Sequence, residues 1–232
     1  MKILCIPDLH CPFNHIDSFA FVKTVNDFFG PDKIIFLGDE IDGHSISFHD
    51  KDPDLFSPSQ ELEKAIERLI PFYELFPKAT ILESNHGSLV YRKGKFHGLP
   101  RNVFKSYREI LQAPKGWKWV YDLVLKSNGR DIYFHHGQRR DSLSNSKSHS
   151  MCYVQGHHHT NFEIRYWANK RDIYWGVTSG CLIDHKQLAF TYAKTYALKP
   201  LLGCTIIDSG IPYLIPMILN KDGRWVGNIN LK

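Results

Sequence analysis

Histidine, aspartate and asparagine side chains gather where the short apolar runs of this sequence end. The first run is followed by Asp8 and His10, and the run at 34–37 is followed by Asp39 and Asp42. Residues two apart in an extended chain point to the same side, so Asp8 and His10 can converge on one point. A carboxylate at the end of a buried strand is costly unless a positive charge compensates it. Taken alone, these strand ends indicate either a cation site or a set of solvated aspartates.

Three later apolar runs end in the same kinds of side chain, among them the adjacent Asn85 and His86. His135 and His136 end another run, and because neighbours in a strand point to opposite sides, only one of the two can be a ligand. The last run ends in three consecutive histidines, of which the first and third share a face while His158 points away. The side chains collected from the five strand ends are those of Asp8, His10, Asp39, Asp42, Asn85, His86, His136, His157 and His159.

These side chains offer imidazole, carboxylate and amide groups but no thiolate. Such nitrogen and oxygen donors suit manganese, iron, zinc or similar ions rather than a structural zinc. They are too many for one tetrahedral site. We therefore predict that they divide between two ions, with one carboxylate bridging both.

The composition is that of an ordinary globular protein. The chain has 232 residues, of which 43% are apolar and 23% charged, enough for one large domain or two small ones. No linker separates the halves, so we predict a single domain over residues 1–232. The net charge of +5 suits an anionic substrate but is too small on its own to indicate nucleic acid.

The five cysteines form no CxxC pair, and Cys5 and Cys204 lie in apolar runs. An odd number without that spacing indicates a reducing compartment and no disulfide framework. No signal peptide is visible, and no apolar stretch is long enough to span a bilayer. We therefore expect a cytoplasmic protein without membrane contact, and the sequence leaves its oligomeric state open.

Helical and strand patterns alternate in the first half of the chain, and strand patterns dominate the second. Apolar spacing predicts helices at 17–29 and 57–70, the second with a capping box at Ser57 and a kink or end at Pro71. A third helix is predicted in the second half of 92–108. Strands are predicted at 3–6, 33–37, 80–83, 119–125, 131–135, 151–155, 172–177, 203–207 and 213–219.

The order of the strand-end motifs resembles that of the calcineurin-like metallophosphoesterase superfamily. Its pattern is DxH, GDxxD, GNH followed by an acid, a later histidine, and GHxH. Here these motifs read Asp8-Leu9-His10, Gly38-Asp39-Glu40-Ile41-Asp42, Ser84-Asn85-His86, His136-Gly137 and Gly156-His157-His158-His159. The resemblance implies an α/β fold, a four-layer α/β/β/α sandwich of two mixed β-sheets flanked by helices. The chain departs from the pattern twice, with Ser84 in place of a glycine and Gly87 in place of an acid.

The resemblance implies two divalent metal ions, with manganese expected first and iron, zinc, nickel or cobalt as alternatives. The first ion would take Asp8, His10, Asp39 and His159, and the second Asp39, Asn85, His136 and His157. Asp39 would bridge the two ions. His86 resembles the acid/base histidine of the pattern, and Asp42 resembles the aspartate that orients it.

On this resemblance the protein is a metal-dependent phosphoesterase, and the ester is cleaved by attack of a metal-bound hydroxide. We expect a phosphodiesterase or nuclease acting on nucleotides or nucleic acid. The arginine that follows GDxxD in protein phosphatases is absent, since Gly43-His44 stands after Asp42. One alternative is a phosphomonoesterase acting on nucleotides or phosphoproteins. The other is a metal-binding scaffold without catalysis, against which the complete ligand set argues.

Two basic clusters begin just after the motifs and are predicted to bind substrate phosphates. They consist of Arg92, Lys93, Lys95, Arg139 and Arg140. The alternative for the first cluster is an ordinary solvated helix surface. The loop at 43–55 directly follows Asp42 and is either a cover over the site or a solvated connection.

Overall fold

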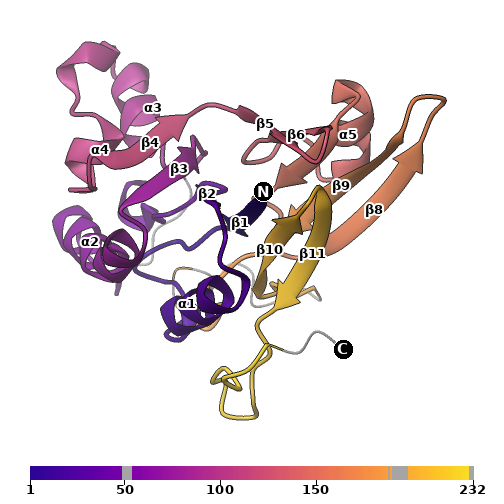
Figure 1. The fold of residues 1–232 in the computed structure, drawn as a ribbon. Helices are drawn as coiled ribbons and strands as arrows, with labels where there is room; N and C mark the ends of the chain where they lie inside the picture. Colours follow the sequence, from indigo (N-terminus) through magenta and orange to yellow (C-terminus); the bar gives the residue numbers. More distant parts are fainter. Residues whose placement is uncertain (49–53, 188, 190–197, 230–232) are drawn as a thin grey trace.

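Two mixed sheets face each other in the computed structural model, which describes residues 1–48, 54–187, 189 and 198–229 (Figure 1). The first sheet has the order β11-β10-β1-β2-β3-β4, and the second has the order β5-β6-β7-β9-β8. The strands of the first are β1 (Lys2–Ile6), β2 (Lys33–Phe36), β3 (Lys78–Leu82), β4 (Gly116–Val120), β10 (Gly203–Asp208) and β11 (Ile211–Pro216). The strands of the second are β5 (Leu123–Ser127), β6 (Arg130–Phe134), β7 (Cys152–Gln155), β8 (Phe162–Ala168) and β9 (Ile173–Ser179).

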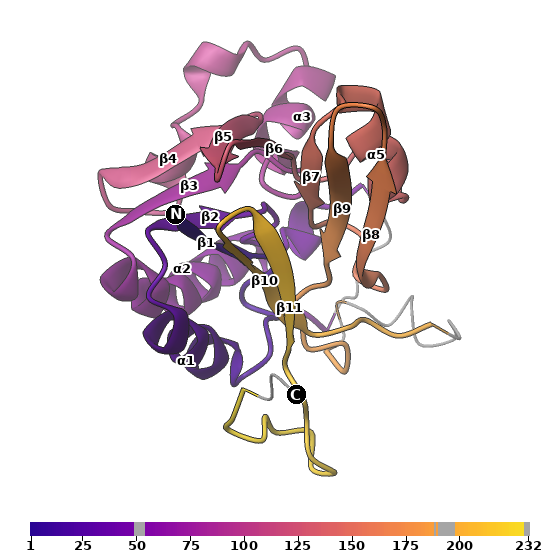
Figure 2. The same cartoon turned by 45° about the vertical axis from the view of Figure 1, so that its right-hand side comes forward.

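Helices cover the outer face of each sheet. The first sheet packs against α1 (Ser18–Phe29) and α2 (Pro58–Leu75), and the second packs against the shorter α5 (Ser142–His149). Figures 1 and 2 show α1 and α2 on one side of the molecule and α5 on the other, with both sheets between them. The predicted four-layer α/β/β/α sandwich is therefore confirmed.

The central strand β1 is buried on both faces, as its continuous apolar run predicts. Leu4 and Ile6 pack toward the helices, while Ile3 and Cys5 pack between the two sheets. Burying one such aliphatic side chain stabilises the fold by about 1.5–3 kcal/mol. The residues that follow β1 therefore start from a rigid base.

Parallel pairing in the middle of both sheets places several strand ends at one edge. The pairs β1–β2, β2–β3, β6–β7 and β7–β9 are parallel, so their carboxyl ends point the same way within each sheet. The segments that leave these ends carry the predicted site residues. This edge is where ligands bind in open α/β sheets.

Several predicted elements have other boundaries in the structure. The capping box at Ser57 forms, but α2 does not end at Pro71 and continues to Leu75, because Phe72 and Tyr73 are buried against the first sheet. The predicted strand at 119–125 splits into β4 and β5, which belong to different sheets.

The segment after β3 also differs from its prediction. The helix falls in its first half as α3 (Leu89–Phe96), followed by a 3-10 turn (Arg101–Val103) and the one-turn α4 (Tyr107–Ile110). The strand β8 and the helix α5 were not predicted, since α5 is polar nearly throughout and has no helical apolar period.

Three further sequence expectations concern the loop after Asp42, the cysteines and membrane-spanning segments. A short 3-10 helix (His44–Ile46) begins the loop after Asp42, and residues 49–53 of that loop lie outside the described residues. All five cysteines are buried with free thiols. Within the described ranges, no helix has both the length and the apolar composition that a membrane crossing requires.

Candidate metal centre

The predicted ligands meet where segments leaving β1, β2, β3, β6 and β7 come together. Three groups of side chains place their ligand atoms within 4.8 Å of one another. The groups are Asp8, His10, Asp39 and His159; Asp39, His136 and His157; and His10, Asp42 and His86. The first two groups share Asp39, in the way the resemblance implies for a bridge.

One carboxylate oxygen lies between the two groups. Asp39 Oδ2 is 3.4 Å from His10 Nε2 and 3.2 Å from His136 Nε2. The other oxygen, Oδ1, accepts a hydrogen bond from the main-chain N–H of His86 at 3.1 Å. Asp39 is buried, so both oxygens are committed inside the cluster.

The first group is crowded with atoms that can bind a cation. His10 Nε2 lies 3.2 Å from His159 Nε2, and His159 Nε2 lies 3.2 Å from Asp8 Oδ2. The carboxylate of Asp42 bonds His10 Nδ1 at 2.9 Å, which turns Nε2 of that ring toward the cluster. A carboxylate behind a ligand histidine is the usual way that a metal site fixes its imidazole.

The second group is arranged around His136. The Leu37 carbonyl oxygen accepts a hydrogen bond from Nδ1 of this ring at 2.8 Å, so in the neutral ring Nε2 carries a lone pair. That lone pair faces Asn85 Oδ1 at 2.7 Å and His157 Nδ1 at 3.1 Å. The amide oxygen of Asn85 can only accept a hydrogen bond. No proton therefore lies between it and His136 Nε2 unless the His136 ring is protonated.

Both groups therefore fit divalent ions. Lone pairs converge from oxygen and nitrogen atoms, and Asp8 Oδ1 is buried without a hydrogen-bond partner among the described residues. Four or more such donors without sulfur form the environment that manganese, iron and zinc accept. A cation at each group would satisfy atoms that protein hydrogen bonds leave unsatisfied.

The pKa values report the negative character of the cluster. Burial disfavours the charged form of Asp39, but the charge of His136 holds its pKa well below the usual value. Burial opposes charge on His10 as well, yet hydrogen bonds to Asp39 and Asp42 raise its pKa to about 10. Burial also lowers the pKa of His136, but the charge of Asp39 outweighs it and raises this pKa to about 9. Bound cations would displace these protons, because a ligand histidine must be deprotonated.

Three of the ligand residues have left-handed backbone, with φ of 51° at His10, 49° at Asp39 and 65° at His157. Such a conformation costs a residue other than glycine about 1–3 kcal/mol and persists only where its surroundings enforce it. The His10 N–H donates to the Asp39 carbonyl oxygen at 2.8 Å, and the His157 N–H donates to Asp8 Oδ2 at 2.6 Å. Hydrogen bonds to other residues of the cluster thus hold His10 and His157 in this conformation.

Two motif glycines are required by close approach. A Cβ at Gly156 would lie 2.4 Å from Asp8 Oδ1, and one at Gly38 would lie 2.7 Å from His136 Nδ1. Gly38 also has a φ of +99°, which other residues rarely adopt. These glycines let the chain pass directly against the ligand side chains.

His86 lies beside the cluster, but Asp42 contacts it in an unexpected way. Its Nδ1 donates to the main-chain carbonyl oxygen of Asp42, whereas the Asp42 carboxylate bonds His10. The expectation that the Asp42 carboxylate orients His86 is therefore corrected, because that carboxylate is engaged by a ligand histidine. The backbone of Asp42 orients His86 instead.

The two departures from the motif pattern have partners that the sequence did not reveal. Ser84 Oγ accepts from the N–H of Asp39 at 2.9 Å and from the N–H of Gly87 at 3.0 Å, which ties the ends of β2 and β3 together. A Cβ at Gly87 would lie 3.6 Å from Glu40 Oε1, so a buried carboxylate lies next to the position where the pattern has an acid. Trp119 Nε1 donates to that oxygen at 2.9 Å. Glu40 occupies an unspecified position of GDxxD, so spacing gave no signal.

The neighbouring histidines lie outside the three groups. His136 rather than His135 joins the cluster, and His135 Nδ1 accepts a hydrogen bond from the Gly137 N–H at 3.0 Å. His158 also stays outside. The cluster therefore holds the side chains that alternation predicts, although His157 itself lies beyond the end of β7 in a left-handed conformation.

An open cleft of about 350 Å³ adjoins the cluster, and Asn85, His136 and His157 line it. Of the predicted phosphate-binding residues, all of them described, only Arg92 lines it. Arg92 Nη2 donates to the Asn85 carbonyl oxygen at 2.7 Å.

The other four predicted phosphate-binding residues do not line the cleft. Lys93 Nζ lies 3.9 Å from the centre of the Phe48 ring, and Arg140 Nη2 bonds Thr160 Oγ1 at 3.3 Å. Lys95 and Arg139 are exposed.

Comparison with known proteins gives one family match and similar solved structures. A family model described as calcineurin-like phosphoesterase matches residues 1–186. The solved structure of Yfce, a phosphoesterase from E. coli, has a TM-score of 0.50 and 14% identity, covering 97% of each chain. An archaeal phosphodiesterase has a TM-score of 0.49 and 11% identity, covering 93% of this chain and 99% of its own. No curated protein sequence matches the chain. At these identities the Yfce likeness concerns the fold alone.

Proposed function

This chain belongs to the calcineurin-like phosphoesterase family and is a metal-dependent phosphoester hydrolase, and from that premise we propose that it cleaves phosphodiesters of nucleotides or nucleic acid with two metal ions. The observation that carries the two-metal proposal is the shared oxygen of Asp39. Asp39 Oδ2 lies within 3.4 Å of ligand nitrogens from both groups. A single carboxylate so placed suits a bridge between two ions.

The charge of the cleft supports a diester. Arg92 is the cation that lines it in the described part of the chain, and the carboxylate of Glu83 lines it as well. Because Glu83 is paired with Arg101 at 3.5 Å and two ions would balance the reacting phosphate of either ester, Arg92 is left to hold a flanking phosphate. A nucleic-acid diester has such a phosphate and a simple monoester does not.

The protein's own residues would divide the work of hydrolysis. When bound, two divalent ions polarise the ester and acidify a water molecule for attack at phosphorus. Because His86 Nδ1 is bonded to the Asp42 carbonyl oxygen, Nε2 is the atom that can hold a proton for the leaving oxygen. Arg92, which lines the cleft, would hold a phosphate, and Asp42 and Leu37 fix the rings of His10 and His136.

The test compares bis(p-nitrophenyl) phosphate with p-nitrophenyl phosphate on protein loaded with manganese, beside elemental analysis of the same preparation. We expect about two ions per chain and faster turnover of the diester. Asp39→Asn should lower the metal content and abolish turnover, since its oxygen serves both groups. A wild-type content of one ion would contradict the bridge. Faster turnover of the monoester would favour a phosphomonoesterase, and loading with iron, zinc, nickel or cobalt would test the choice of manganese.

A further inference from the structure

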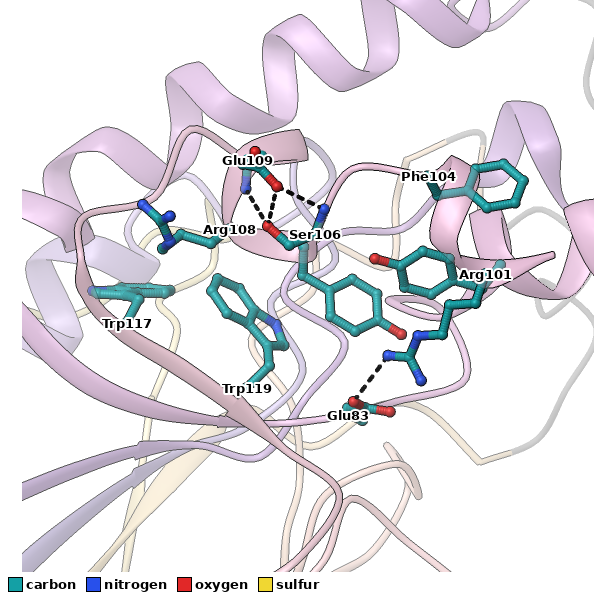
Figure 3. A pocket seen from close by; sticks show the side chains of 10 residues that line it. Glu83, Arg101, Phe104, Ser106, Arg108, Glu109, Trp117 and Trp119 are labelled. Atoms are coloured by element: carbon teal, nitrogen blue, oxygen red, sulfur yellow. Dashed lines mark hydrogen bonds and ion pairs between the residues drawn. The ribbon is translucent and has the colours of Figure 1, made fainter.

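A second cavity of about 550 Å³ lies beyond β3, between edge strand β4 and the segment from α3 to α4 (Figure 3). Its volume falls in the range of roughly 300–1,000 Å³ that is typical of small-molecule sites. We name it the outer pocket. Its lining residues are mainly aromatic and charged: Glu83, Tyr91, Arg101, Phe104, Ser106, Tyr107, Arg108, Glu109, Trp117 and Trp119.

The aromatic wall of the outer pocket is well supported. Tyr107 and Trp117 are buried, while Trp119 is half-buried and shows part of its ring. The ring centre of Trp119 lies 6.1 Å from those of Tyr107 and Trp117, and Trp117 Nε1 donates to the Phe76 carbonyl oxygen at 2.7 Å. The Trp119 ring is therefore held in place before any ligand arrives.

Charged groups frame this wall. Arg108 and Arg101 are exposed, and Arg101 lies 4.8 Å from the centre of the Tyr91 ring and 3.5 Å from Glu83. Figure 3 shows Arg108 near Trp117, with Arg101 and Glu83 across the pocket from it. Aromatic faces with guanidinium groups suit a planar, electron-rich ring, which can stack on both. An aliphatic ligand would gain neither of these stacking contacts.

The outer pocket adjoins the metal centre through two connections. Glu83 lines both the outer pocket and the cleft, and it stands two residues before Asn85. Trp119 bonds Glu40, the residue after Asp39. A ligand that spans the two cavities would pass over Glu83.

We propose that the outer pocket binds the nucleobase next to the scissile phosphate, with Trp119 as its stacking surface and Arg108 at its edge. This inference rests on the proposed function and goes beyond it by naming the part of the substrate that is recognised. Stacking tolerates any base, since every base has a flat π-face, so the pocket favours nucleosides over non-aromatic groups without selecting one sequence.

The test uses the manganese-loaded protein and three p-nitrophenyl diesters: those of thymidine 5′-phosphate, deoxyadenosine 5′-phosphate and methyl phosphate. We expect kcat/KM to be about ten to one hundred times higher for the nucleoside esters, the preference that one stacked base gives. In Trp119→Leu this ratio should fall close to one. In Trp119→Phe most of it should remain, because both variants lose the bond to Glu40 but only Trp119→Leu loses the ring.

A second pair of variants guards against a folding defect in Trp119→Leu. Arg108→Gln should lower the ratio about threefold or more, while Lys115→Gln, which removes an exposed charge outside the pocket lining, should keep it. The inference is overturned if the wild type turns over all three esters with equal kcat/KM. It is also overturned if the ratio survives in a folded Trp119→Leu or, where that variant does not fold, in Arg108→Gln.

Failure of the proposed function would have a different signature. If the wild type hydrolyses none of the esters, calorimetry with thymidine 5′-phosphate and deoxyribose 5-phosphate still tests whether the outer pocket binds a nucleobase. Binding of the nucleotide about tenfold more tightly, with loss of the difference in Arg108→Gln, supports the outer pocket. Equal affinities overturn it.

Discussion

The metal edge and the outer pocket share strand β3 but are built in different ways. By the metal edge we mean the strand-end segments 8–10, 39–42, 85–86, 136 and 157–159. Its predicted ligands follow the ends of buried parallel strands, where main-chain hydrogen bonds and left-handed residues fix the backbone. The outer pocket is assembled from short helical turns laid against the edge strand β4. On our proposals, the residues of the reaction therefore stand on the sheets, and the residues that recognise the substrate stand on an irregular segment.

Removing the proton donor of the metal edge gives the largest expected effect. His86→Ala should lower kcat about 10²–10⁴-fold, the usual share of general acid–base catalysis. Metal content should not change, because His86 stands beside the shared Asp39 without completing either of its two groups. Steady-state kinetics on a chromogenic diester, with elemental analysis, measures both quantities.

The same variant sharpens the comparison between the two regions. The preference for nucleoside over methyl esters should survive in His86→Ala, because the outer pocket keeps its lining. His97→Ala, at the exposed end of α3, serves as the control for loss of an imidazole. Loss of metal together with turnover would recast His86 as a ligand and would refute its role as an acid.

The metal edge could be predicted almost entirely from the sequence, whereas the outer pocket could not. Strand alternation separates His136 from His135, and buried strands must deliver their ends to one edge of the sheet. Strand alternation does not predict the contacts of Asp42. Its carboxylate bonds His10, while its main-chain carbonyl oxygen accepts a hydrogen bond from His86. Spacing gives no sign of which part of a residue makes a contact.

The outer pocket depends on packing between segments that carry no clear period. The sequence predicts a single strand at 119–125, but the chain changes sheets after Val120, which leaves Trp119 at an edge. The helix predicted in the second half of 92–108 lies instead at Leu89–Phe96. Tyr91, Trp117 and Trp119 come together only through this tertiary packing, which overrides local secondary-structure propensity.

Arg92 lines the cleft beside the metal edge, and its loss should have an intermediate effect. Arg92→Gln should raise KM for a dinucleotide about tenfold, because a hydrogen bond to a charged group contributes about 1.5–3 kcal/mol. It should also flatten the dependence of KM on salt, since one phosphate contact is lost. Lys93→Gln should do less, because Lys93 lies over the Phe48 ring and does not line the cleft.

Initial rates at several salt concentrations separate these cases. Equal effects of Arg92→Gln and Lys93→Gln would mean that general surface charge, not the cleft, attracts the substrate. A fall in metal content in Arg92→Gln would point instead to its bond with the Asn85 carbonyl oxygen. In that outcome Arg92 would belong to the metal edge.

The smallest expected effect comes from a contact outside both regions, where Asp17 joins the start of α1 to the C-terminal segment. Arg224 donates to both of its oxygens, at 2.8 and 2.6 Å, and the Trp225 N–H donates to it at 3.0 Å. The bonds from Arg224 lower the pKa of Asp17 from 3.8 to about 2. The Arg224 side chain is 60% exposed, so solvent screening reduces the contribution of the pair to about 1 kcal/mol.

Asp17→Asn should therefore lower the free energy of unfolding by about 1 kcal/mol at neutral pH. Because the folded pKa lies below the ordinary value, this contribution is fully present above pH 3.8 and is lost as the pH falls toward 2. Urea unfolding at pH 7 and at points between 4 and 2 measures the difference, and Arg224→Gln should reproduce it. Metal content and the preference for nucleoside esters should stay at wild-type values. A change in either would show that the C-terminal segment is coupled to one of the two regions, and which quantity changes identifies the region.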